Sequence, residues 1–101
     1  MAQTATYTLV NAKSTSATYD MATNQANVVA RTVYISGTLT GTVKIEASPV
    51  DSGDEWVEVM SVTTVGVKSF TIDPVCKRLR GKLADMVAGP VTVKVCCRYE
   101  Q

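Results

Sequence analysis

The fold is decided by residues 33–59, VYISGTLTGTVKIEASPVDSGDEWVEV. Within this stretch, residues 42–47 alternate strictly, with Val43 and Ile45 on the apolar face and polar side chains on the other. That period of two is typical of a half-buried β-strand. Glycines bracket a tight turn before this strand, and residues 51–56 close a second turn after it. The stretch therefore predicts three β-strands joined by two tight turns.

The composition extends this prediction to the whole chain. Valine contributes 16 of the 101 residues and threonine 14. Both side chains are branched at Cβ, and such side chains fit well on a pleated surface. Short apolar runs recur every 8 to 12 residues or so, with Gly, Pro and Asp between them, which is typical of a sandwich. We expect one domain, residues 1–101, forming a single antiparallel β-sandwich, jelly-roll or immunoglobulin-like, of about seven to eight short strands.

Two segments are harder to interpret. Residues 13–27 are polar and lack a hydrophobic period, so residues 1–27 are predicted to form a strand followed by a long loop that acts as an arm. Tyr19 and Met21 are the apolar side chains by which this arm would contact a partner or pack down as a short strand. Residues 79–87 fit either a strand or a helical turn, since Leu79 and Leu83 also match a spacing of four.

Charge and hydropathy exclude several classes of partner. Ten Lys and Arg residues against nine Asp and Glu leave a net charge of +1. Such a balance provides no field to attract nucleic acid or a membrane surface. No apolar run reaches the length of a membrane span, and the first twenty residues lack the pattern of a secretory signal. We expect synthesis and folding in a cytoplasm.

The three cysteines fit a reducing compartment, because their number is odd and the chain is long enough to fold without disulfides. Cys96 and Cys97 are adjacent, so on a strand their side chains point to opposite faces and cannot share a metal ion. Free buried thiols are the favoured interpretation. A bridge from Cys76 to either of them stays open.

Catalysis is not expected. The chain has no histidine and no Gly-rich phosphate loop, which removes the commonest general base and a common nucleotide site. Asp51, Asp54 and Glu55 could offer oxygen ligands to calcium. Their arrangement fits a β-turn better, with Asp51 bonding backbone amides, Gly53 at positive φ and Trp56 packing over the end of the sandwich. We predict no cofactor, no metal and no enzyme.

The strongest local charge is the basic group Lys77, Arg78, Arg80 and Lys82. Arg78, Arg80 and Lys82 share one strand face, where they either keep that face soluble or contact an acidic protein surface. The aromatic residues suggest a further class, because a platform of Trp56 and the tyrosines could stack on sugars. Core and interface packing is the more common use of such residues.

Short motifs follow one another in a characteristic order: Ser36-Gly37-Thr38, Gly41-Thr42-Val43, Ser48, Asp51-Ser52-Gly53, Trp56, Arg78-Leu79-Arg80 and Gly89-Pro90-Val91-Thr92-Val93. This order, over about residues 33–98, resembles small β-sandwich virion proteins of tailed bacteriophages. The resemblance implies a non-enzymatic protein that decorates or cements the capsid by contacts with the major capsid protein or other virion subunits. It also implies localisation in the virion and a homo-oligomer, for which a trimer is one arrangement. A tail or head-to-tail neck component is the alternative, and a carbohydrate-binding module is the alternative of another class.

Overall fold

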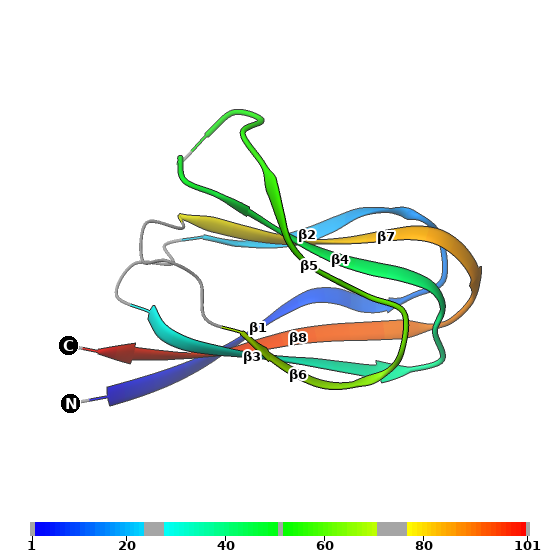
Figure 1. Ribbon diagram of the computed structural model, residues 1–101, viewed down its shortest axis with the longest axis horizontal. Helices are drawn as coiled ribbons and strands as arrows, with labels where there is room; N and C mark the ends of the chain where they lie inside the picture. Colours follow the sequence, from blue (N-terminus) through cyan, green and yellow to red (C-terminus); the bar gives the residue numbers. More distant parts are fainter. Residues whose placement is uncertain (1, 24–27, 51, 71–76, 101) are drawn as a thin grey trace.

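The computed structural model describes residues 2–23, 28–50, 52–70 and 77–100, and it shows two layers of β-strands (Figure 1). The strands are β1 (Ala2–Lys13), β2 (Ala17–Thr23), β3 (Val28–Gly37), β4 (Thr40–Ser48), β5 (Val57–Val62), β6 (Gly66–Phe70), β7 (Arg78–Ala88) and β8 (Val91–Glu100). None of the described residues forms a helix that could cross a membrane. The predicted all-β sandwich is confirmed.

The strand order selects the jelly roll from the two predicted topologies. The first sheet has the order β1-β8-β3-β6 and the second has the order β2-β7-β4-β5. All pairings are antiparallel, and β1 pairs with β8, β2 with β7, β3 with β6 and β4 with β5. This is the pattern of one long hairpin rolled up into two sheets. Both chain ends consequently lie at the same end of the first sheet (Figure 1).

The core lies between the two sheets and consists of the inward-facing residues of the alternating strands. β8 contributes Val91, Val93, Val95 and Cys97, all without exposed surface, as the alternation predicts. The other buried apolar residues are Leu9, Val10, Val28, Val33, Ile35, Val43, Ile45, Ala47, Leu79 and Leu83. Valine dominates because its branched side chain packs efficiently between pleated sheets.

A close approach between the sheets depends on a glycine in β7. A Cβ atom on Gly81 would lie 2.8 Å from a methyl carbon of Val10 and 3.0 Å from the Cβ of Leu9. Real Cβ atoms do not approach other carbons so closely. Gly81 therefore allows β1 to cross directly over β7.

The structure shows the conformation of the two segments that the sequence left ambiguous, within residues 13–27 and 79–87. Residues 17–23 form β2 and pair with β7, so the described part of the predicted N-terminal arm is built into the two sheets. Of the two predicted alternatives, a long loop or a short strand, residues 17–23 form the strand. The loop was the more obvious interpretation because β2 is an edge strand with a register shift between Thr18 and Met21, which hides its alternation. Residues 79–87 belong to β7, and the helical alternative was wrong because the tertiary pairing with β2 and β4 overrides a weak spacing signal.

The cysteines of β8 occupy opposite faces, as predicted. Cys97 is buried between the sheets, and Cys96 is half-buried on the outer face. Cys76 lies outside the described residues.

Candidate functional site

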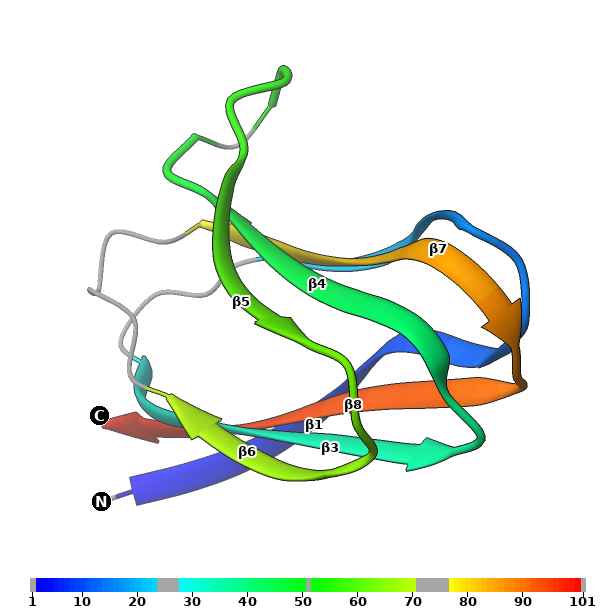
Figure 2. The same cartoon turned by 45° about the vertical axis from the view of Figure 1, so that its right-hand side comes forward.

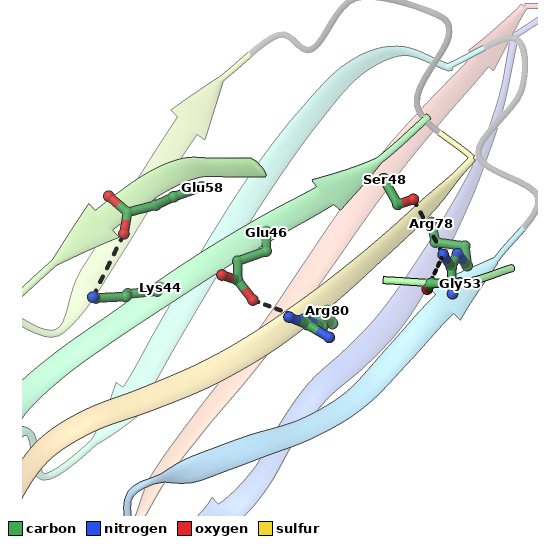
Figure 3. A network of polar contacts seen from close by, with 7 residues as sticks. All are labelled: Lys44, Glu46, Ser48, Gly53, Glu58, Arg78 and Arg80. Carbon is green, nitrogen blue, oxygen red and sulfur yellow. Dashed lines mark hydrogen bonds and ion pairs between the residues drawn. The ribbon is translucent and has the colours of Figure 1, made fainter. Parts of the chain in front are cut away.

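β7 positions the predicted basic residues on the outer face of the second sheet. Leu79, Gly81 and Leu83 alternate inward, so Arg78, Arg80 and Lys82 point away from the core. The structure brings the first two together with the loop between β4 and β5 (Figure 3). It leaves Lys82 apart from that cluster.

Arg78 anchors this loop. Its side chain is only 7% exposed. Nε donates a hydrogen bond to the carbonyl oxygen of Val50 at 2.9 Å, and Nη2 donates to the carbonyl oxygen of Gly53 at 2.9 Å and to Ser48 Oγ at 3.2 Å. The expectation of an exposed charge at Arg78 was wrong, because the loop folds back over β7 and uses its donors. Contact of Arg78 with another protein stays a prediction.

Arg80 and Trp56 complete the cluster. Arg80 Nε lies 2.7 Å from Glu46 Oε1 on the neighbouring strand β4. The guanidinium carbon of Arg80 lies 4.0 Å from the centroid of the Trp56 ring, and that of Arg78 lies 4.5 Å from it. Such cation–π contacts hold an aromatic ring in place. Trp56 therefore packs against the guanidinium groups of the first residues of β7. Its predicted packing over the end of the sandwich stays a prediction.

The remaining lysines on this face differ in their surroundings. Lys44 Nζ lies 3.6 Å from Glu58 Oε1. Lys82 is the direct cross-strand neighbour of Lys44 and has no ion pair with any residue that the structure describes. Like charges on opposed residues repel each other. Lys82 is consequently the basic residue of this face that is best placed to receive an acidic group from outside.

The predicted contact residues of the N-terminal segment lie on β2, the strand next to β7, where Met21 is the cross-strand neighbour of Arg80. Tyr19 is half-buried and packs on the core, its hydroxyl donates to the carbonyl oxygen of Thr15, and Lys13 Nζ lies 5.9 Å from its ring centroid. The side chain of Met21 lies outside the described part of the structure. A contact of Tyr19 or Met21 with a partner protein stays a prediction.

The turn predicted for residues 51–56 agrees with the structure at Gly53. Gly53 has a φ of +91°, the left-handed conformation that glycine adopts at low cost. Asp51 lies outside the described residues, and no group of three His, Cys, Asp or Glu side chains among the described residues is close enough to hold a metal ion.

Sequence reasoning missed a side of the sandwich that is rich in exposed valine. β5 and β6 follow each other and form the edges of the two sheets on the same side (Figure 2). Val57 is 62% exposed and Val67 is 63% exposed, and Val59 and Val65 are exposed as well. We call these four residues the valine edge. The alternating pattern gives no warning of it, because residue 59 lies at a bulge in the β4–β5 pairing where the simple inward–outward rule fails.

An aromatic residue of the first sheet lies next to the valine edge. Tyr34 of β3 is exposed and is the direct cross-strand neighbour of Val67. Large exposed apolar side chains that gather in one region mark contact surfaces more often than isolated ones do. By contrast, Tyr7 and Tyr19 pack toward the core, and Trp56 lies under two guanidinium groups. The described aromatic side chains therefore do not assemble the sugar platform considered from the sequence.

A second feature missed from the sequence is a buried arginine. Arg31 of β3 is 2% exposed, and none of its three guanidinium nitrogens has a hydrogen-bond partner among the described residues. Its cross-strand neighbours are Cys97 of β8 and Phe70 of β6. Arg31, Val33 and Ile35 occupy alternate positions along the strand, and this spacing in the sequence already indicates that the side chain of Arg31 points inward.

Comparison with known proteins supports the fold. No protein-family model matches the chain, and no curated protein matches it. The chain is similar in structure to the SPBc2 prophage-derived protein YomS, with a TM-score of 0.72 and 17% sequence identity. The match covers 97% of this chain and 95% of that chain. At this level of identity the likeness is one of fold, and it shows that the whole arrangement of the β-sandwich is shared.

Proposed function

We propose that this chain is a non-enzymatic structural protein of a tailed-phage particle, which decorates or cements the capsid by binding coat subunits. The observation that carries the proposal is the valine edge, four exposed valines on β5, on β6 and on the connection between them. Two further facts support it. The protein of similar fold is prophage-derived, and jelly rolls are common among viral capsid proteins.

The mechanism is burial of apolar surface against a neighbour. The valine edge and Tyr34 would form the centre of the contact, where water is excluded. Lys82, which lacks an ion pair among the described residues, would lie among the polar contacts around it. The cluster of Arg78, Arg80 and Trp56 would act within the protein, because it fixes the loop that leads into β5.

The test is binding of the purified protein to expanded heads, free capsomers and tails of the phage that encodes it. We expect co-sedimentation with expanded heads and little binding to free capsomers. Sedimentation with tails alone would contradict a capsid role and favour the tail or neck position. Failure to bind any of these particles would contradict a structural role in the virion.

The valine edge is tested with Val57→Ser combined with Val67→Ser. Burying one valine side chain contributes roughly 1.5 kcal/mol, so each substitution is expected to weaken head binding by about tenfold. Both side chains are largely exposed, so the fold should persist. The matched control is Val87→Ser, which alters a valine that is 81% exposed on β7, outside the valine edge. Equal losses in the control and the double variant would contradict the assignment.

A further inference from the structure

The four edge strands of the sandwich differ in how they are protected against pairing with other chains. An edge strand presents unpaired backbone N–H and C=O groups, and natural proteins block such edges with charges, bulges or very short strands. β2 contains Asp20 and a register shift. β5 contains Glu58 and lies beside a bulge, and β6 has only five residues with Lys68 at its centre.

The first half of β1 has no charged residue, no bulge and no shortened length that would block pairing. Residues 2–8, AQTATYT, contain no charged residue, no glycine and no proline. Their pairing with β8 is continuous from Ala2 to Thr8, and the register shifts begin only after Thr8. Within the described structure, no strand pairs with the other side of residues 2–8. This is a regular, uncharged strand edge on a protein whose other three edges are blocked.

The side-chain pattern of this edge is complementary to itself. An antiparallel pairing of two copies of β1 about Ala5 places Thr4 of one copy opposite Thr6 of the other, twice. Both threonines are exposed on the outer face, and opposed threonines are favourable cross-strand pairs. No charge on residues 2–8 would repel its symmetry mate. A two-fold contact of this kind closes on itself and yields a dimer, not a fibre.

We propose that residues 2–8 of β1 are the pairing edge for a second copy of this chain, so that two first sheets join into one continuous sheet. The interaction is strand addition, in which backbone hydrogen bonds provide the affinity and the threonine pairs fix the register. The proposal does not depend on the capsid role, because it concerns two copies of the chain alone.

The experiment measures the mass of the purified protein by sedimentation over a range of concentrations. We expect a concentration-dependent dimer for the natural sequence. The variant T4E/T6E places glutamates opposite each other across the two-fold axis and should raise the dimer Kd by roughly tenfold or more. Its fold should persist, because Thr4 is the cross-strand neighbour of Arg98 and the new carboxylate can pair with it.

A mixing experiment separates loss of pairing from loss of folding. T4K/T6K should also be monomeric, and mixing it with T4E/T6E should restore a dimer, because glutamate then opposes lysine at every pair. The control Thr18→Glu alters an exposed residue of the edge strand β2 and should leave the dimer intact. A natural protein that is monomeric throughout, a T4E/T6E variant that still dimerises, or a mixture that stays monomeric would each overturn the proposal. None of these results would bear on binding to phage heads.

Discussion

At the scale of single residues, Arg31 is the most unusual feature of the core. A guanidinium group stays charged at all ordinary pH values, and a buried charge without partners is costly. Among the described residues Arg31 has no hydrogen-bond partner, although it lies between Cys97 and Phe70 within the first sheet. Its side chain therefore contributes packing to the core without a hydrogen bond from its guanidinium group to any of the described residues.

We expect Arg31→Met to stabilise the protein, since methionine has a similar length and no charge. Replacing buried ionic groups by apolar residues is often stabilising by about 1–4 kcal/mol. The measurement is the free energy of unfolding from urea denaturation. Arg98→Met, at an exposed position of β8, is the control and should change stability little. A large loss of stability in Arg31→Met would show that an acceptor compensates the charge.

Arg78 is the opposite case, because its donors are used within the protein. Arg78→Met removes two hydrogen bonds to the loop and one to Ser48 at the end of β4. Hydrogen bonds made by charged groups contribute about 1.5–3 kcal/mol each, so a loss of roughly 4 kcal/mol or more is expected. Trp56 is the only tryptophan, and its fluorescence should shift to longer wavelength as the loop loosens. Arg80→Met should cost less, because Arg80 and its partner Glu46 are partly exposed; equal effects would contradict the anchoring role.

At the scale of elements, the crossing of β1 over β7 depends on Gly81. Gly81→Ala would force the new methyl group against Val10 and Leu9, and such overpacking typically costs about 1–3 kcal/mol. Thermal unfolding followed by circular dichroism measures this. Gly53→Ala is the comparison, because no atom lies within 4 Å of the new methyl group and only the positive φ opposes it. A Gly81→Ala variant as stable as the natural protein would contradict the close approach.

The elements also differ in how far their sequence predicts them. β4 and β8 alternate regularly, and their buried residues match the predicted faces. β5 does not follow a simple alternation, because a bulge in its pairing with β4 falls at residue 59. β2 is a strand because of its partner β7, which local sequence cannot reveal. The anchoring role of Arg78 could not be predicted from the local sequence either, because it depends on a loop from another part of the chain.

At the scale of the whole molecule, the two sides of the sandwich have different surfaces. One side carries the valine edge on β5 and β6, and the other carries the unblocked strand β1 beside β2. A dimer formed through β1 would therefore leave two valine edges facing outward, away from the two-fold axis. Such a dimer would present two identical apolar surfaces, which suits a protein that links neighbouring subunits of a symmetric particle.

The jelly-roll order also governs when the protein can fold. Ala2 pairs with Glu100, so the first strand meets its partner only after nearly the whole chain has been synthesised. Contacts between such distant residues slow folding, because a long loop must close before they form. Until then the uncharged residues 2–8 have no partner strand, a state in which nascent chains aggregate readily. The N-terminal half should therefore reach its final pairing only after β8 has been synthesised and can pair with β1.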